Sequence, residues 1–282
     1  MTLEAEYDNR ARVPDHPEIF ARWKREAAAY REKAMQAGRA ELGLRYGPTG
    51  RQMIDIFYPA ERAGAPLALF IHGGYWRSLE PALFSHIAGG LNAHGVTVAV
   101  AGYDLCPQVR VTDIIAQVRA AARFLWEKSG QRMLVYGHSA GGHLAACLVA
   151  TDWDAIDKDL PADLTPVGMA ASGVFDLTPL LQVSMNNDLR MDAEEVRRVS
   201  PLTWPIGSGR ILDVTVGAAE SAAFRAQSRA VAETWKKAGA TTRFEECAGA
   251  NHFTIVDPLA QPDSAEVARL VALAERVRSK AR

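Results

Sequence analysis

One serine lies in a pattern that could do nucleophilic chemistry, Gly137-His138-Ser139-Ala140-Gly141, between the apolar run 133–136 and a run of small residues, 141–151, that can continue as a helix. A serine on a sharp turn between a strand and a helix exposes its hydroxyl to a substrate, as in a nucleophile elbow. Glycine is needed on both sides, because larger side chains would collide with the neighbouring strand or helix. The simpler interpretation is an ordinary turn in which Ser139 caps the helix. The flanking strand and helix favour a nucleophile.

A serine hydroxyl is a weak nucleophile, so acyl transfer requires a base, a carboxylate that orients the base, and donors for the developing oxyanion. Two histidines, His143 and His252, follow Ser139 in the chain. His143 falls inside the predicted helix and is expected to be structural. His252 lies in a loop after the predicted strand 241–247, which is where a base belongs in this arrangement.

Two glycines follow the first buried strand, in His72-Gly73-Gly74-Tyr75-Trp76. Without Cβ atoms, the backbone here can turn its amides toward a substrate carbonyl, and the loop at this place supplies the oxyanion hole of lipases and esterases. We expect the donors to be the amides of Gly74, Tyr75 and Ala140. Their neighbours Gly73, Trp76 and His138 are predicted to contact the substrate. The alternative is a glycine turn that only ends the strand.

The elements that must position these residues alternate between strand and helix from residue 66 onward. The predicted strands are 67–71, 97–100, 133–136, 167–172, 210–216 and 241–247, and the predicted helices are 81–94, 111–128, 141–151, 192–198, 221–237 and 264–278. Such alternation predicts an α/β fold with a mainly parallel sheet and helices on both faces. Before it, a hairpin of strands 41–46 and 52–58 is expected at a sheet edge, and a helix over 17–36 that either packs on the domain or caps the active site.

Composition narrows the class of protein. Of 282 residues, 48% are hydrophobic and 23% charged, with a net charge of -1, which favours one globular domain (1–282, with 1–40 an N-terminal helical segment and possible cap) and gives no reason to expect nucleic-acid or membrane binding. The three cysteines lie far apart, and the N-terminus lacks an apolar signal region, so we expect a cytoplasmic protein. No metal or cofactor is expected, and the protein is predicted to be a monomer or homodimer.

The motifs 72–76, 137–141 and 249–253 together resemble those of α/β-hydrolases of the kynurenine formamidase (arylformamidase) group, which neighbours the hormone-sensitive-lipase-like esterases. The segment Tyr103-Asp104-Leu105-Cys106-Pro107 adds to the resemblance, which spans about residues 66–257. It implies the α/β-hydrolase fold and hydrolase chemistry, and it assigns the oxyanion hole to Gly74 and Tyr75. It leaves the substrate open.

The resemblance also indicates where the carboxylate should lie, namely in the loop that leaves the strand 210–216. Many relatives carry aspartate there, whereas this chain has Glu220, and glutamate is an accepted alternative in such hydrolases. Asp176, after an earlier strand, is the second candidate. Asp213 lies in the middle of its strand and is expected to be structural.

The resulting prediction is a serine hydrolase that cleaves a small aryl formamide of the N-formylkynurenine type through an acyl-enzyme. Ser139 would be the nucleophile, His252 the base and Glu220 the orienting acid. The aromatic leaving group is expected to stack near Trp76. Two alternatives remain at this point: a carboxylesterase for short acyl esters, and a hydrolase-fold protein that binds a small molecule without turning it over.

Overall fold

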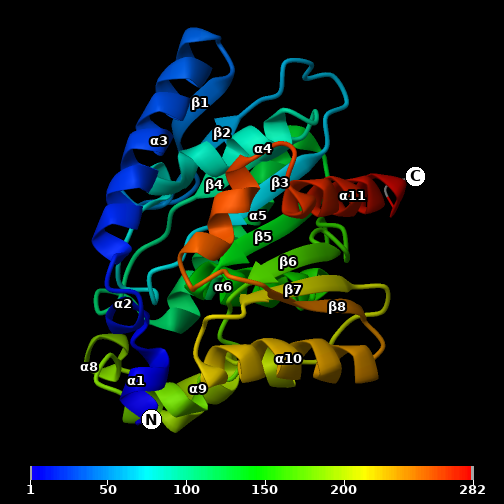
Figure 1. Cartoon of the computed structure of the whole chain (residues 1–282). Helices are drawn as coiled ribbons and strands as arrows, with labels where there is room; N and C mark the ends of the chain where they lie inside the picture. The colour runs from blue at the N-terminus through cyan, green and yellow to red at the C-terminus, as the bar shows by residue number, and fades with distance from the viewer. Residues whose placement is uncertain (1, 281–282) are drawn as a thin grey trace.

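The computed structural model describes residues 2–280 and is built on one eight-stranded sheet (Figure 1). Its strands are β1 (Ala40–Arg45), β2 (Met53–Phe57), β3 (Leu67–Ile71), β4 (Thr97–Ala101), β5 (Met133–His138), β6 (Val167–Ala171), β7 (Ile211–Gly217) and β8 (Thr241–Cys247), in the order β1-β2-β4-β3-β5-β6-β7-β8. The pairs β1–β2 and β2–β4 are antiparallel, and the remaining pairs are parallel. The predicted edge hairpin and mainly parallel sheet are therefore confirmed.

Helices cover both faces of this sheet. They are α1 (Leu3–Tyr7), α2 (Asn9–Arg12), α3 (His16–Gln36), α4 (Ala88–Asn92), α5 (Val111–Ser129), α6 (Ala140–Val149), α7 (Trp153–Ile156), α8 (Asn186–Leu189), α9 (Ala193–Val199), α10 (Ala222–Lys237) and α11 (Ala265–Lys280), with 3-10 helices η1 (Pro81–Ile87), η2 (Thr178–Gln182), η3 (Pro201–Thr203) and η4 (Thr254–Ala260).

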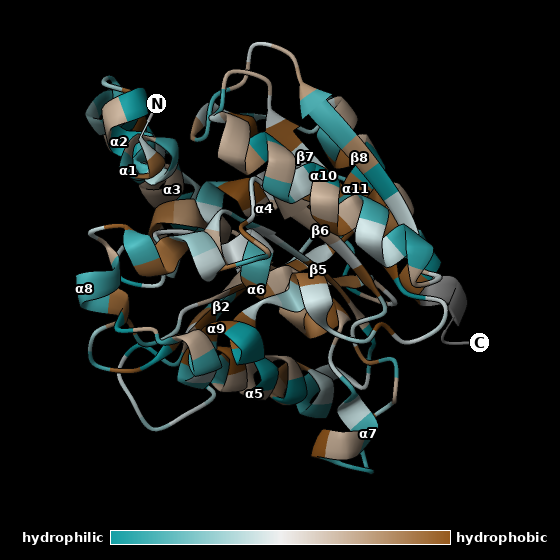
Figure 2. Cartoon of the chain, turned by 90° about the horizontal axis from the view of Figure 1, so that it is seen from below, coloured by the Kyte–Doolittle hydropathy of each residue, from teal (hydrophilic) through white to brown (hydrophobic). Residues whose placement is uncertain are grey.

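The side chains of the central strands divide between two cores because successive residues of a strand point to opposite faces. In β3, Leu67, Leu69 and Ile71 join the core under α5, α6 and α10, whereas Ala68 and Phe70 join the core under α3, α4 and α11. Burial on both faces explains why β3 is a continuous apolar run. In Figure 2 the hydrophobic colour gathers in the interior, while β8 and α8 are mostly hydrophilic at the surface.

Two local predictions differ from the structure. Residues 81–94 were expected to form one helix, but the first part is the 3-10 helix η1, which begins at Pro81 and is followed by the short α4. Within the predicted N-terminal helical segment (1–40) only one helix, 17–36, was placed, and the structure adds two short helices before it. These are α1 and α2, each capped by a side chain: Thr2 accepts from Ala5 N–H, and Asp8 accepts from Ala11 N–H.

The register of the parallel strands places the loops that carry the predicted catalytic residues at one edge of the sheet. Ile71 at the end of β3 pairs with Gly137 in β5, and Gly217 at the end of β7 pairs with Cys247 at the end of β8. The loops that follow these strands leave at the carboxyl edge of the sheet, where open α/β sheets bind their ligands.

Candidate active site

Ser139 lies on a strained turn between β5 and α6. Its backbone has φ 56° and ψ -122°, a conformation that residues other than glycine rarely adopt. Its N–H donates to the carbonyl oxygen of Ala171 at 2.8 Å. A Cβ atom at Gly137 would lie 2.2 Å from the Gly141 oxygen, and one at Gly141 would lie 1.9 Å from the Ile71 oxygen. Both glycines are therefore required by close backbone contacts, as the sequence predicted for a nucleophile elbow.

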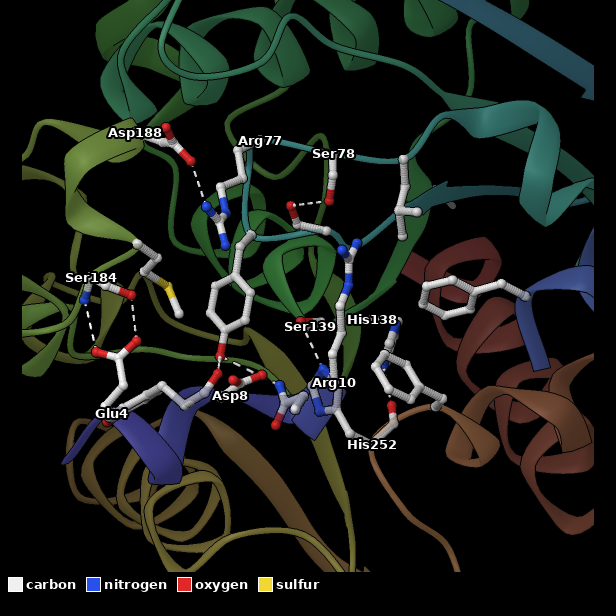
Figure 3. Close-up of a pocket in the computed structure, with 18 of the residues that line it drawn as sticks. Glu4, Asp8, Arg10, Arg77, Ser78, His138, Ser139, Ser184, Asp188 and His252 are labelled. Atoms are coloured by element: carbon white, nitrogen blue, oxygen red, sulfur yellow. Dashed lines mark hydrogen bonds and ion pairs between the residues drawn. The ribbon is translucent and has the colours of Figure 1, made fainter. Parts of the chain in front are cut away.

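The structure brings His252 and Glu220 into line with this serine. The Ser139 Oγ lies 3.0 Å from His252 Nε2, and His252 Nδ1 lies 2.7 Å from Glu220 Oε2 (Figure 3 shows the first two residues). All three residues are buried, with at most 5% of their surface exposed. With a carboxylate at Nδ1, the ring proton lies on that nitrogen, so Nε2 accepts a hydrogen bond from the serine hydroxyl. This is the geometry required of a nucleophile, a base and an orienting acid.

The Glu220 carboxylate is held on its other side by two donors. Its Oε1 accepts hydrogen bonds from Gly217 N–H, at 2.7 Å, and from the Ser172 hydroxyl. Ser172 follows β6 with φ 53°, a left-handed conformation that is unusual outside glycine. The sequence analysis did not include Ser172, because its contact with Glu220 depends on how β6 and the loop after β7 lie side by side.

The other candidate carboxylates have different partners. Asp176 Oδ1 accepts from Thr178 N–H at 2.9 Å and so closes a local turn. Asp213 forms an ion pair with Arg269 of α11, as expected for a structural residue in the middle of β7. Neither carboxylate has a hydrogen bond with His252 in the part of the chain that the structure describes.

The loop after β3 has the strained backbone expected of an oxyanion hole. Gly74 has φ 114°, where a Cβ would lie 2.2 Å from the Ser78 oxygen, and Tyr75 follows with φ 48°. Within residues 2–280, the amides of Gly74 and Tyr75 donate to no protein group. Ala140 is the first residue of α6, where helical amides have no partner within the helix. Three N–H groups are thus available at the two loops that flank the serine.

The structure corrects the predicted substrate contacts of Trp76 and Gly73. Trp76 is completely buried, packs edge-on against His143 with ring centroids 4.9 Å apart, and does not line the cavity at Ser139. With a φ of 55°, the side chain of Trp76 points into the core. This direction could not be predicted from the residue type. Gly73 also lies outside the cavity lining; a Cβ there would be 2.9 Å from the Ser139 Cβ, so its role is close backbone approach.

His138 lines the cavity and contacts the loop of the predicted base. Its Nε2–H donates to the backbone oxygen of His252 at 2.6 Å. Burial, together with the neighbouring His252, lowers the pKa of His138 to about 3, so its ring is neutral. His143, by contrast, bonds the Val199 oxygen at 2.6 Å inside the core, which agrees with the structural role predicted for it.

The serine opens into a cavity of about 360 Å³, within the usual range for small-molecule sites. One wall comes from residues 2–13, called here the cover segment, which contains α1 and α2. Tyr7, Asp8, Asn9 and Arg10 of this segment line the cavity together with Ser139 and His252 (Figure 3). Helix α3, for which both packing on the domain and capping of the site were considered, contributes Phe20 and Trp23 to the lining. The sequence analysis included these residues only in a helical segment and possible cap, 1–40. It did not identify the two short helices or their place in the cavity wall, because helices of five and four residues show no hydrophobic period.

Three further observations concern metal ligands, cysteines and membrane-spanning helices. Among the described residues, no three histidine, cysteine, aspartate or glutamate side chains are grouped so that they could hold a metal ion. The thiols of Cys106, Cys147 and Cys247 are free. No helix within residues 2–280 is long and apolar enough to cross a membrane.

Comparison with known proteins agrees with this geometry. Residues 68–256 match a protein family whose description is alpha/beta hydrolase fold. The chain belongs to the α/β-hydrolase family. It is 30% identical over 236 residues to a kynurenine formamidase of Danio rerio, covering 81% of this chain and 80% of that protein. It is 32% identical over 237 residues to a kynurenine formamidase of Drosophila melanogaster, covering 78% of this chain and 77% of that protein.

A solved structure resembles almost the whole chain. It is a protein of a Silicibacter species described as a candidate thioesterase, with a TM-score of 0.83, 33% identity, and coverage of 98% of this chain and 99% of that one. The family and these relatives make the present α/β-hydrolase an enzyme of the formamidase and esterase kind that acts on a small molecule. The non-catalytic alternative is thereby set aside.

Proposed function

We propose that this α/β-hydrolase cleaves formamides of aromatic amines through a formyl-enzyme on Ser139. The observation that carries the mechanism is the continuous hydrogen-bonded line from Ser139 through His252 to Glu220, with distances of 3.0 and 2.7 Å. The choice of a formamide is supported by similarity to proteins named kynurenine formamidase over about four fifths of their length.

In the first half of the proposed reaction, Ser139 Oγ attacks the formyl carbon while His252 Nε2 takes the hydroxyl proton. Glu220 stabilises the imidazolium through Nδ1–H without taking the proton itself. The negative charge that develops on the formyl oxygen accepts hydrogen bonds from the amides of Gly74, Tyr75 and Ala140. Each donor placed in this way lowers the barrier by about 3 to 4 kcal/mol.

In the second half, His252 gives its proton to the leaving nitrogen, and the C–N bond breaks to release the amine. Water then enters, loses a proton to His252 and attacks the formyl ester. The ester oxygen leaves as Ser139, which recovers its proton from His252, and formate is released. Thus His252 acts in turn as base and acid, and no redox step or external co-reactant other than water is needed.

A short-chain ester or thioester hydrolase is the second candidate function. The same three residues would form an acetyl-enzyme as readily as a formyl-enzyme, and the similar Silicibacter protein is described as a candidate thioesterase. The two functions differ in the leaving group, because an amine must be protonated by His252 as it leaves whereas a phenolate or thiolate leaves more easily.

The test compares kcat/KM for N-formylkynurenine with that for 4-nitrophenyl acetate, using wild type and Ser139→Ala. The formamidase proposal expects efficient turnover of N-formylkynurenine and a loss of about 10³-fold or more in the alanine variant, because only binding and oxyanion stabilisation remain. If only the acetate ester is hydrolysed, and Ser139→Ala abolishes this activity, the esterase function replaces the formamidase. Undiminished turnover by Ser139→Ala would refute the nucleophile itself.

A further inference from the structure

The cover segment (residues 2–13) is attached to the loop that carries the oxyanion donors. The Tyr75 hydroxyl donates to the Tyr7 carbonyl oxygen at 2.7 Å and accepts from Asn9 Nδ2 at 3.4 Å. In the same segment, the Glu6 carboxylate accepts a hydrogen bond at 2.9 Å from the amide of Ala223, which lies at the beginning of α10. These contacts hold the segment across one side of the cavity, whose lining includes Glu4, Tyr7, Asp8, Asn9 and Arg10.

Five charged side chains line the cavity: Glu4, Asp8, Arg10, Arg77 and Asp188. Four of them already have partners. Arg77 and Asp188 form an ion pair, Glu4 accepts from the Ser184 amide at 2.8 Å, and Asp8 accepts from the Ala11 amide at 3.0 Å.

Arg10 differs from these four. Its guanidinium forms no hydrogen bond or ion pair with the described residues, and its carbon lies 5.9 Å from the centroid of the Phe20 ring. Figure 3 shows the side chain rising from the cover segment across the cavity, toward the loop that carries Arg77 and Ser78. A permanently charged group that crosses a substrate cavity without an anionic partner is suited to bind an anionic part of the substrate.

Aromatic rings lie beside Arg10 on the same wall. Phe20 and Phe253 both line the cavity and meet edge to face, with centroids 5.0 Å apart. Phe253 directly follows the predicted base His252. An aryl group next to Ser139 can therefore contact these rings, and a carboxylate attached to that aryl group can reach Arg10. Phe20 and Phe253, rather than Trp76, are thus the aromatic side chains that the leaving group can contact.

We infer that Arg10 is a specificity-determining residue that binds a carboxylate on the leaving-group side of the substrate. The inference rests on the proposed function for the reacting bond, because it places the aryl amine, rather than the acyl group, toward the cover segment. A guanidinium and a carboxylate form two parallel hydrogen bonds with fixed geometry. The substrate class is thus an acylated aryl group that carries a free carboxylate a few bonds from the ring.

The test measures kcat/KM for two pairs of substrates that differ only in that carboxylate. The first pair is N-formylkynurenine and its primary carboxamide. The second pair is 3-(4-acetoxyphenyl)propanoate and 3-(4-acetoxyphenyl)propanamide, which asks the same question of an ester. Wild type is compared with Arg10→Gln, with Arg10→Lys, and with Arg25→Gln, which removes the same charge from an exposed position of α3 outside the cavity.

The expected result is that Arg10→Gln lowers kcat/KM for the acids by about 10- to 100-fold, mainly through KM, as for loss of one hydrogen-bonded charge pair. The carboxamides should change by less than about 2-fold. Arg10→Lys should retain part of the preference because it keeps the charge but not the paired donors. Arg25→Gln should behave as wild type. Equal losses for acid and carboxamide, or no loss for either, would overturn the inference.

The two pairs separate this inference from the proposed function. If formamides are not cleaved but the acetates are, and Arg10→Gln affects only the acetate that carries a carboxylate, the role of Arg10 stands and the formamidase proposal fails. If N-formylkynurenine is cleaved and Arg10→Gln distinguishes neither pair, the role of Arg10 fails alone. Calorimetric binding of N-formylkynurenine and its carboxamide to Ser139→Ala, with and without Arg10→Gln, repeats the comparison without turnover; equal affinities in all four cases would also reject it.

Discussion

Replacing Glu220 by glutamine should disable the proposed base without changing the size of the side chain. The two carboxylate oxygens have separate partners: Oε2 faces His252 Nδ1, while Oε1 accepts from Gly217 N–H and the Ser172 hydroxyl. A glutamine has one oxygen and one NH₂ group for these two positions. If its oxygen faces Gly217, its NH₂ faces His252 Nδ1, which must then accept. The ring proton moves to Nε2, and the nitrogen nearest the serine can no longer accept its proton.

The opposite orientation of the glutamine is also unfavourable, because its NH₂ would then face the Gly217 N–H. Losing a charge-assisted hydrogen bond to the imidazolium costs about 1.5 to 3 kcal/mol, and either the wrong tautomer or an unpaired buried donor costs about 1 to 3 kcal/mol more. We therefore expect Glu220→Gln to lower kcat by about 10² to 10⁴. KM should change little, since Glu220 does not line the cavity.

Stopped-flow measurement of the acylation burst with 4-nitrophenyl acetate isolates the affected step, because acylation is where the base first acts. Glu220→Asp keeps the charge and should recover part of the rate. Asp176→Asn makes the same carboxylate-to-amide change in a turn closed by the Thr178 amide and should cost far less. A Glu220→Gln enzyme within about 10-fold of wild type, or an Asp176→Asn enzyme that is equally slow, would show that the acid has been wrongly assigned.

Three other predictions concern the attachment of the cover segment, the length of the acyl group, and the buried histidine His86. Tyr75→Phe should lower the free energy of unfolding by about 1 kcal/mol and speed hydrogen exchange of residues 7–9, because the hydroxyl that bonds Tyr7 is lost; unchanged exchange would contradict this. Rates with 4-nitrophenyl esters should fall steeply from acetyl to octanoyl, because a cavity of about 360 Å³ must hold both the acyl chain and the leaving group, and a preference for octanoyl would refute this. Burial lowers the pKa of His86 to about 4, so between about pH 6.5 and 4 the unfolded chain binds a proton that the folded protein does not. The free energy of unfolding should therefore decrease as pH falls through this range, by at most about 1.4 kcal/mol per unit for this residue, and His86→Leu should reduce that slope in urea titrations.

The sequence predicted best those features whose causes are local. The glycines at 137 and 141 are required by backbone atoms within one turn or on the adjacent strand, so the motif itself contains the constraint. The strand β3 was predicted with its observed bounds because burial on both faces requires an uninterrupted apolar run. The helix that begins with Pro81 was predicted as one α-helix, but apolar spacing over so few residues does not distinguish a 3-10 turn from an α-helical one.

Side-chain direction and contacts between distant segments could not be predicted in this way. Trp76 has the residue type of a substrate contact, but its backbone conformation, which depends on the whole loop after β3, directs the indole into the core. Ser172 belongs to no motif, yet it holds the carboxylate of Glu220. Both cases show that a residue's type limits its chemistry, whereas its neighbours in the fold decide whether that chemistry is used.

The difference between local and distant constraints also separates reaction chemistry from substrate choice in this enzyme. The proposed nucleophile, base and acid all follow parallel strands of one sheet, where register alone brings their loops together. Arg10 instead reaches the cavity from the beginning of the chain, through a segment held by hydrogen bonds such as that from Tyr75 to Tyr7. A substitution in this segment can change the charge at the cavity without disturbing the sheet or the turn at Ser139. Relatives that keep the three strand-end motifs but differ before α3 should therefore share the acyl-transfer reaction and differ in the leaving groups that they accept.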